Sequence, residues 1–358
     1  MHSDWIGTTM AAWVHNLDPF VFRVGDGWGL RWYGVSYVLG FLAGWLILRW
    51  WAVRTLTPMS AQRMSDAMVA LVVGVVAGGR LGYVLFYKQS LLWSFNESFP
   101  WWGVLRLNEG GMASHGGMLG VIVAAWWIAR GGKNSAGVVE PRVPTLHVLD
   151  LFALACTPGL MFGRLANFIN GELLGEIVAM PGKPAPWWSV KFPQEYGTSQ
   201  APAGQEEAVH AILGPYRMVG EGDAEAYDRL VGVIRAGGQA GREAAATLGP
   251  LLSARHPSQL YQALAEGVVL GAVLWLIWRR PRVPGVVGCW FLITYGLLRV
   301  LTELIRLPDA DLAVQRFAGL SRGQWLSAAM IAAGAGALTW IVRHGGATMG
   351  GWARRAVS

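Results

Sequence analysis

The chain has 358 residues, of which 53% are hydrophobic and 14% charged, and its mean hydropathy is +0.36. About a quarter of the residues of a soluble domain are charged, so this composition excludes an ordinary soluble protein and indicates a polytopic membrane protein. The net charge of +7 invites nucleic-acid binding, but the basic residues gather in alternate loops between apolar stretches, which argues against it. Cys156 and Cys289 lie within apolar stretches as packing residues, so we expect no disulfide, metal site or cofactor.

The first 30 residues precede the first apolar span. Hydrophobic residues recur at near-helical spacing between Trp5 and Val21, which predicts a helix lying on the membrane surface. A basic stretch followed by an apolar core is missing, so we expect no cleaved signal peptide.

Seven apolar stretches are long enough to cross a bilayer of about 30 Å as helices. They cover residues 32–50, 67–88, 112–129, 148–169, 258–278, 284–304 and 324–342. Arginine and lysine gather in the loops at 49–63, 130–142, 279–282 and 343–355, which the positive-inside rule places in the cytoplasm. The predicted fold is an all-α membrane protein of seven transmembrane helices, with the N-terminus outside and the C-terminus cytoplasmic.

The longest connection, residues 176–255, lies between the fourth and fifth spans and carries more acidic than basic residues. The topology makes it a small extracytoplasmic insertion, with a helical pattern around Glu221–Leu248, and disorder over part of it is the alternative. We therefore divide the chain into an N-terminal interfacial segment (1–30), helices 1–4 (31–175), the insertion (176–255), and helices 5–7 with a cytoplasmic tail (256–358).

Several ionisable side chains lie within or at the ends of the spans, toward the face opposite the basic loops. They are Arg80, His115, Arg164, Glu172, Arg299 and Glu303. A charge in hydrocarbon costs about 3 kcal/mol or more, so it persists only where it pairs, meets water or binds a polar ligand. One shared depth on separate helices predicts one polar cavity.

A weak internal repeat supports a shared depth for two of these charges. Asp66–Leu85 and Asp150–Ile169 both run Asp, thirteen uncharged residues, then Arg-Leu. On a helix each arginine would lie about 20 Å from its aspartate. Chance similarity between two glycine-rich spans is the alternative. Gly74 and Gly78 in the first copy predict close helix packing.

The local patterns around these charges each have a structural and a functional interpretation. Glycines on both sides of His115 expose its imidazole, although composition alone favours a structural histidine. Arg164 and Asn167 share a helical face suited to phosphate oxygens, and an arginine that extends to the interface is the alternative. Arg299 and Glu303, one turn after Tyr295, suit a polar site or a self-neutralising ion pair.

Three further motifs carry weaker signals. Tyr33 begins the first span, where interfacial tyrosine is ordinary. His256-Pro257-Ser258 fits helix capping. Asp309-Ala310-Asp311 is similar to metal-holding acidic pairs of some sugar transferases, but we expect a turn there.

Five sequence blocks, in this order, resemble the bacterial prolipoprotein diacylglyceryl transferase family. They are GGRLGYVLFY, GGMASHGGMLGVI, GRLANFINGELLG, HPSQLYQ and YGLLRVLTELIRLPDA. The resemblance runs from RWYG at residue 31 through the seventh span and leaves out residues 176–255. Two positions depart from the family pattern: Ala166 stands where glycine is usual, and Gln262 stands where an acid is usual.

The resemblance implies transfer of a diacylglyceryl group from phosphatidylglycerol to the lipobox cysteine of a preprolipoprotein signal peptide. It implies a thioether product, release of glycerol 1-phosphate, and a bacterial cytoplasmic (inner) membrane enzyme with its site near the extracytoplasmic face. The implied catalytic residues are His115, Arg299 and Glu303. The implied substrate-binding residues are Tyr33, Arg80, Arg164, Asn167, Glu172, Gly175 and Tyr295. We expect a monomer that needs neither nucleic acid nor metal.

Two other functions remain open from the residues alone. A transporter or flippase for an anionic lipid would suit membrane arginines, but it predicts polar residues through the full membrane depth. A transferase for another lipid-linked group would be favoured by metal dependence traced to Asp309 and Asp311. The proton acceptor also stays open, because arginines near His115 would lower its pKa.

Overall fold

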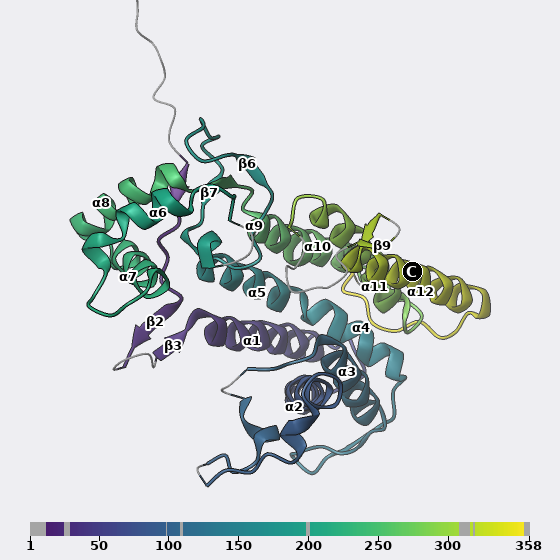
Figure 1. The fold of residues 1–358 in the computed structure, drawn as a ribbon. Coiled ribbons are helices and arrows are strands. Elements are labelled where there is room, and N and C mark those ends of the chain that lie inside the picture. The colour runs from purple at the N-terminus through teal and green to yellow at the C-terminus, as the bar shows by residue number, and fades with distance from the viewer. Residues whose placement is uncertain are drawn as a thin grey trace, which may run out of the picture. The chain divides into compact units, whose positions relative to one another are not determined.

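The computed structural model describes residues 12–24, 29–97, 99–107, 110–197, 201–307, 316–317 and 319–353. The chain forms two compact units, and Figure 1 labels their elements. Unit 1 consists of Met1–Val38, Leu160–Val268 and Tyr295–Ala329. Unit 2 consists of Leu39–Gly159, Val269–Thr294 and Met330–Ser358.

Helices dominate the described residues, and six helical segments are long and apolar enough to cross a membrane. They are Trp32–Val53 (α1), Ala61–Phe86 (α2), Thr145–Asn170, Ser258–Ile277, Val286–Glu303 (α11) and Gly323–His344, which lies within α12 (Arg322–His344). A further apolar helix, Ser114–Ala129 (α3), has 16 residues and is shorter than these. The prediction of a helical membrane protein is confirmed, with six segments of spanning length in place of the seven expected.

Two of the spanning segments are interrupted. Thr145–Asn170 divides into α4 (Thr145–Ala155) and α5 (Thr157–Asn170) at Cys156, next to Pro158, which lacks the N–H that a continuous helix needs. Ser258–Ile277 divides into α9 (Ser258–Gln262), a π-helix η7 (Ala263–Val269) and α10 (Leu270–Ile277). The weak repeat is therefore not matched in local structure, because α2 runs unbroken from Asp66 to Arg80.

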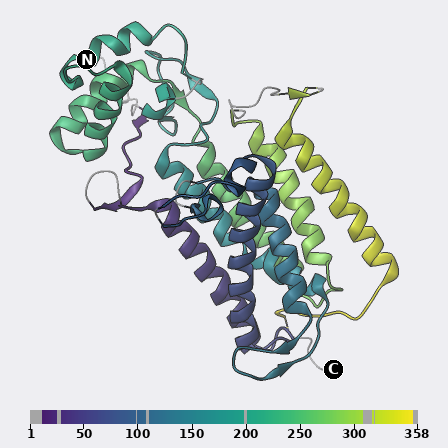
Figure 2. The same ribbon diagram turned by 60° about the horizontal axis from the view of Figure 1, so that its bottom comes forward.

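Helices α2 and α3 of unit 2 lie side by side (Figures 1 and 2). A Cβ atom on Gly78 would collide with the carbonyl oxygen of Gly116, and one on Gly120 would collide with that of Gly74. Small residues allow two helix backbones to approach this closely. The close packing predicted at Gly74 and Gly78 is confirmed.

A buried carboxylate holds the start of α11 in unit 2. Asp150 on α4 is fully buried, and its two oxygens accept hydrogen bonds from the N–H groups of Gly285 and Gly288, each at 2.7 Å. These N–H groups lie at the N-terminus of a helix, where they have no partner within the helix and where the helix dipole favours a negative charge.

The N-terminal segment pairs as strands in unit 1. β1 (Trp13–Val14), β7 (Val190–Lys191), β8 (Ala254–Arg255) and β6 (Ile177–Ala179) form a sheet in that order, with β1 parallel to β7 and the other pairs antiparallel. β2 (Phe20–Arg23) pairs antiparallel with β3 (Gly29–Arg31). The surface helix predicted between Trp5 and Val21 is wrong over residues 12–21, because Pro19 disfavours helix before it and β7 offers backbone partners. Its first residues lie outside the described part of the chain.

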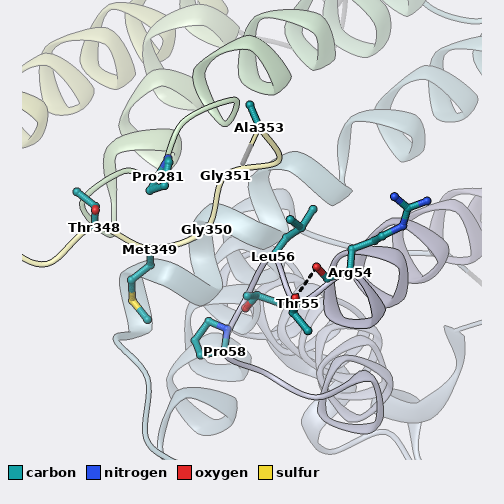
Figure 3. A pocket seen from close by; sticks show the side chains of 11 residues that line it. Arg54, Thr55, Leu56, Pro58, Pro281, Thr348, Met349, Gly350, Gly351 and Ala353 are labelled. Atoms are coloured by element: carbon teal, nitrogen blue, oxygen red, sulfur yellow. Dashed lines mark hydrogen bonds between the residues drawn. The ribbon is translucent and has the colours of Figure 1, made fainter. Parts of the chain in front are cut away.

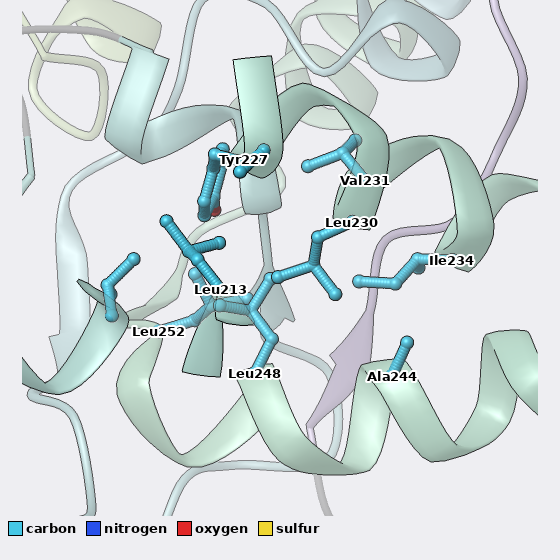
Figure 4. Close-up of a cluster of buried hydrophobic side chains, with 10 residues drawn as sticks. Leu213, Tyr227, Leu230, Val231, Ile234, Ala244, Leu248 and Leu252 are labelled. Carbon is cyan, nitrogen blue, oxygen red and sulfur yellow. The ribbon is translucent and has the colours of Figure 1, made fainter. Parts of the chain in front are cut away.

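Three helices of the insertion form a small core of their own in unit 1. They are α6 (Glu206–Ile212), α7 (Asp223–Ala236) and α8 (Gly238–Leu248). Figure 4 shows Leu230 and Ile234 of α7 directed toward Leu248 and Ala244 of α8. Gly237, with φ of +72°, separates the two helices. The helical pattern expected around Glu221–Leu248 is confirmed, with a break at Gly237.

Short elements complete the described structure. The 3₁₀ helices are η1 (Gln89–Leu92), η2 (Gly103–Leu105), η4 (Pro193–Gly197), η5 (Gly214–Tyr216) and η6 (Gly249–Leu251). Two hairpins pair β4 (Gly132–Lys133) with β5 (Val139–Glu140) and β9 (Arg316–Phe317) with β10 (Leu320–Ser321). These short strands accompany a described structure that is mostly helical.

Candidate active site

Arg164 of α5 is oriented by a buried acid. Its Nε donates a hydrogen bond to Oε2 of Glu266 at 2.9 Å, and the Glu266 side chain is fully buried in the π-helix η7. Tyr295 of α11 also interacts with this guanidinium. All three residues belong to unit 1. A charged acid buried in an apolar segment is stabilised by a neighbouring cation. The hydrogen bond to Glu266 therefore fixes the orientation of the Arg164 guanidinium.

Asn167 lies one turn after Arg164 on α5 and joins two predicted substrate-binding residues. Its Nδ2 donates to the hydroxyl of Tyr33 and, at 3.3 Å, to Oε2 of Glu172. Asn170 donates to the other oxygen of Glu172 at 3.1 Å. The carboxylate of Glu172 is thus placed by two amides that follow Arg164 on α5.

The chain turns back at the end of α5, and this turn positions Glu172. Gly171 has φ of +70°, a left-handed conformation that ends many helices, and the Glu172 N–H donates to the Asn167 carbonyl at 3.0 Å. Gln259 of α9 donates its amide to the Glu172 carbonyl. The Gly171-Glu172 pair after an asparagine-rich helix end is a readable sequence signal for this turn.

Arg299 and Glu303 form a second charged cluster in unit 1. Arg299 Nη2 lies 2.9 Å from Glu303 Oε2, and Arg306 Nη1 lies 3.8 Å from the same oxygen. Ser321 donates its hydroxyl to Glu303 Oε1 at 3.1 Å. Among the described side chains, the Glu303 carboxylate therefore faces two guanidiniums. Tyr295, one turn before Arg299 on α11, connects it to Arg164.

His15 fixes the N-terminal strand to the end of α5. Its Nε2 lies 2.8 Å from the Phe168 carbonyl oxygen, and its ring packs against the rings of Phe168 and Phe192. Burial lowers the pKa of His15 to about 4, against the backbone hydrogen bond that favours the charged form. The imidazole is therefore neutral near pH 7, and its Nε2–H donates a hydrogen bond to the Phe168 carbonyl oxygen.

Gly175 is a close-packing residue in this structure. It forms a β-bridge with Arg306, and a Cβ atom there would collide with the His256 carbonyl oxygen. Arg255 donates to the Gly175 carbonyl at 3.2 Å and to Glu195 at 2.9 Å, and both of these charged side chains are fully buried. The backbone at Gly175 is thus held from several sides.

Arg80 belongs to unit 2, where carbonyl oxygens surround it. Its Nε donates to Val104, its Nη2 donates to Gly103, and its Nη1 donates to Gly110 and Gly111. The side chain is 4% exposed. These four bonds hold two chain segments to α2, at Gly103–Val104 and at Gly110–Gly111, and the latter segment leads into α3.

His115 also belongs to unit 2, in the first turn of α3. Its ring lies 5.1 Å from the Phe86 ring and 5.8 Å from the Tyr87 ring, measured between centroids. The imidazole is partly exposed, as the flanking glycines predicted. Among the predicted site residues, the structure brings together those of unit 1, and Arg80 and His115 lie in unit 2.

Three residues of the unit 1 site were missed by sequence reasoning. Glu266 was noticed only as an interruption of an apolar span, although an intramembrane acid is itself a functional signal. Arg306 lies three residues after Glu303, beyond the end of α11, so helical spacing gave no signal for it. Ser321 is distant in sequence and gave no signal.

The remaining sequence observations concern the two positions that differ from the family pattern and the acidic pair before the seventh span. Ala166 is buried on α5, and Gln262, where the family pattern has an acid, is fully buried at the end of α9. Asp309 and Asp311 lie outside the described residues. In the described part of the chain no group of three His, Cys, Asp or Glu side chains is arranged to hold a metal ion.

Comparisons with known proteins agree with these motifs. A family model described as prolipoprotein diacylglyceryl transferase matches residues 19–340. Proteins named phosphatidylglycerol–prolipoprotein diacylglyceryl transferase are similar over nearly the whole chain. The one from Bdellovibrio bacteriovorus is 39% identical over 95% of this chain and 97% of its own length. The one from Burkholderia thailandensis is 36% identical over 93% and 97%. The chain belongs to the prolipoprotein diacylglyceryl transferase family.

Proposed function

We propose that the chain transfers the diacylglyceryl group of phosphatidylglycerol to the lipobox cysteine of preprolipoproteins, the first step of bacterial lipoprotein maturation. The names of its relatives support the reaction. The observation that carries the proposal is the presence of two arginines in unit 1, each paired with an acid: Arg164 with Glu266, and Arg299 with Glu303. Tyr295 interacts with Arg164 and lies one helical turn before Arg299.

The reaction creates negative charge on a departing phosphate. The cysteine thiolate attacks the glyceryl carbon, a carbon–sulfur bond forms, and the bond from that carbon to the phosphate oxygen breaks. The electron pair of that bond stays with the oxygen, so a phosphodiester with one negative charge leaves as glycerol 1-phosphate with two. Fixed cations placed around that phosphate stabilise the transition state more than the bound lipid.

Arg164 and Arg299 are the phosphate clamp in this proposal. A guanidinium offers a planar fork of donors that matches phosphate oxygens. Glu266 and Glu303 position the two guanidiniums. Each carboxylate binds one edge of its arginine and leaves the other N–H groups directed toward the phosphate. Asn167, Tyr33 and Tyr295 orient the glycerol headgroup, and Glu172 holds Asn167.

His115 is the proposed base that accepts the thiol proton. A cysteine thiol has a pKa of about 8.5 and attacks only as thiolate, so a base accelerates the step. Arg80 acts by position in this account, because its bonds to Gly110 and Gly111 set the backbone a few residues before His115. Gly175 acts through the tight backbone beside Arg306 and His256.

The proposed membrane arrangement has α3 as a further span beside the six of full length. With the basic loops in the cytoplasm, the N-terminus and the insertion lie outside, and the site faces the extracytoplasmic side of the inner membrane. The acceptor is the signal peptide of a preprolipoprotein, and the enzyme acts as a monomer.

The proposed function predicts a covalent product. Purified protein incubated with labelled phosphatidylglycerol and a lipobox peptide is expected to yield a peptide carrying diacylglycerol on its cysteine, measured by mass spectrometry, with equimolar glycerol 1-phosphate. A peptide with serine in place of the cysteine is the control and should stay unmodified. Lipid movement across a membrane without any adduct would contradict the proposal in favour of a transporter.

A further inference from the structure

An apolar groove in unit 2 is lined by residues to which the proposed reaction gives no role. It has a volume of about 520 Å³ and is lined by the last turns of α1 and by one residue of α10. The lining residues are Leu46, Ile47, Arg49, Trp50, Val53 and Trp275. The Trp50 and Trp275 rings lie 6.1 Å apart between centroids. Five of the six lining side chains are hydrophobic, so the groove suits a hydrocarbon chain.

Three exposed guanidiniums of unit 2 are each stacked on a tryptophan, and one of them, Arg49, lines the groove. Arg49 lies over Trp45 at 5.6 Å, and Arg54 lies over Trp50 at 5.4 Å. Arg279 lies over Trp352 at 5.8 Å, and Trp352 donates its ring N–H to the Trp275 carbonyl at 2.9 Å. Stacking on an aromatic face orients a guanidinium but leaves its charge uncompensated.

The segments that contain Arg49, Arg54 and Arg279 carry no negatively charged side chain. Residues 32–58, 270–285 and 344–353 contain no Asp or Glu. Within the described residues, Arg49, Arg54 and Arg279 form no ion pair. An apolar groove with unpaired cations at its border is complementary to an amphipathic anion and repels a cationic one.

A more polar hollow of unit 2 is lined in part by Arg54, the residue after Val53 of the groove (Figure 3). It has a volume of about 680 Å³, and its lining includes Thr55, Thr57 and Thr348. Its far wall is the C-terminal segment, which forms a β-bridge between Met349 and Arg282. The Arg54 side chain points away from this segment in Figure 3 and lies over Trp50, which lines the groove.

We propose that this groove binds an anionic glycerophospholipid of the leaflet on the side of the basic loops. An acyl chain lies along Leu46, Val53 and Trp275, the phosphate meets Arg49 and Arg54, and the polar headgroup extends toward the threonine-lined hollow. The site differs in its residues from the proposed phosphate clamp of unit 1. It therefore stands whether or not the transfer reaction is confirmed.

Binding of phosphatidylserine to the purified full-length protein tests the proposal. Phosphatidylserine is anionic and is not the proposed donor, and a diazirine group on its acyl chain allows the contact to be mapped. We expect crosslinks on the peptides that contain residues 46–53 and Trp275. We also expect the Arg49→Gln, Arg54→Gln double variant to bind roughly ten-fold more weakly or worse, because each arginine near a lipid surface adds to anionic affinity.

A matched control separates this site from general charge. The Arg130→Gln, Arg343→Gln double variant removes two exposed arginines of unit 2, one of them stacked on Trp126, and leaves the groove intact. It should bind phosphatidylserine like the unmodified protein, and inorganic phosphate should not compete. Equal loss in both double variants, equal binding of phosphatidylcholine, competition by phosphate, or crosslinks elsewhere would each overturn the proposal. Transferase turnover and elution volume verify that the variants are folded.

Discussion

At the scale of single residues, the most consequential contact is that between Glu266 and Arg164. Glu266 is fully buried, and Arg164 Nε is its hydrogen-bonded cation at 2.9 Å. Removal of one partner from a buried pair leaves the other charge without compensation. The carboxylate therefore has two effects on the enzyme, one on stability and one on the direction in which the guanidinium faces.

Replacement of Glu266 by glutamine keeps the shape of the side chain and removes its charge. We expect kcat for diacylglyceryl transfer to fall on the order of 10²-fold, since a misplaced group of this kind costs about that much. The KM for phosphatidylglycerol should change less, because the phosphate gains charge as it departs. Kinetics of the purified variant give both values, and Glu207→Gln, an exposed acid of the same unit, is the control. A rise in KM of about 10²-fold with an unchanged kcat would instead show that Glu266 contributes only to substrate binding or to structure.

The residues also show what could be foreseen at this scale. Arg164, Asn167 and Glu172 were grouped because polar residues stand out in an apolar span, whereas Tyr33 was assigned only through the family resemblance. The structure joins Asn167 to both Tyr33 and Glu172. Glu266 was not assigned to the set, because a π-helix changes which residues share a face and has no signature in the sequence. Arg80 was expected to bind substrate, yet its guanidinium is occupied by backbone carbonyls, and a sequence cannot show where loop carbonyls will lie.

At the scale of elements, the docking of β1 depends on a neutral histidine. His15 has a pKa lowered by burial to about 4, whereas an unfolded histidine has a pKa of about 6.5. The unfolded state therefore binds a proton below pH 6.5 that the folded state does not bind until about pH 4. The stability of this packing is full above pH 6.5, is lost as the pH falls through that window, and stays constant below it.

Hydrogen exchange of the β7 amides paired with β1 measures this effect. We expect their protection to fall between pH 7 and pH 4.5 by more than the intrinsic exchange rates account for. His15→Gln, which retains a donor toward the Phe168 carbonyl without titrating, should abolish this change. If the variant and the original protein lose protection alike, another group controls the docking of β1.

The packing of α2 against α3 gives a second prediction for elements. Gly120→Ala places a methyl group into the Gly74 carbonyl, so we expect the free energy of unfolding to fall by roughly 2 kcal/mol, the usual cost of overpacking. Gly336→Ala on α12 is the control, because nothing lies within 4 Å of its Cβ position. Thermal unfolding in detergent compares the two variants. An unchanged midpoint for Gly120→Ala would show that the two helices can separate without cost.

Some helices and strands could be predicted from the sequence, and others could not. Long apolar stretches without charge predicted the spanning segments, because burial in a membrane demands such composition. Residues 12–21 were mistaken for a helix, because β7, which pairs with β1, is 177 residues away in the sequence and gives no local signal. A helical pattern was expected around Glu221–Leu248, and the structure divides it into α7 and α8 at Gly237, where φ is positive.

At the scale of the whole molecule, the two units contain different groups of polar and charged residues. Unit 1 holds the two arginines with their acids and the folded insertion, while unit 2 holds His115, Arg80 and the arginine-bordered groove. The central claim is that Arg164 and Arg299 grip the phosphate of the donor lipid. That claim concerns residues of one unit only, and it is open to a direct assay.

The most direct measurement is transfer from labelled phosphatidylglycerol to a lipobox peptide by purified Arg164→Ala, Arg299→Ala and the double variant, with Arg343→Ala as the control. We expect a loss of at least roughly 10²-fold in each single variant, as for other fixed groups that stabilise a developing charge, and no loss in the control. We also expect the double variant to be worse than either single variant. Normal formation of the cysteine adduct by folded Arg164→Ala would contradict the claim that this guanidinium clamps the phosphate.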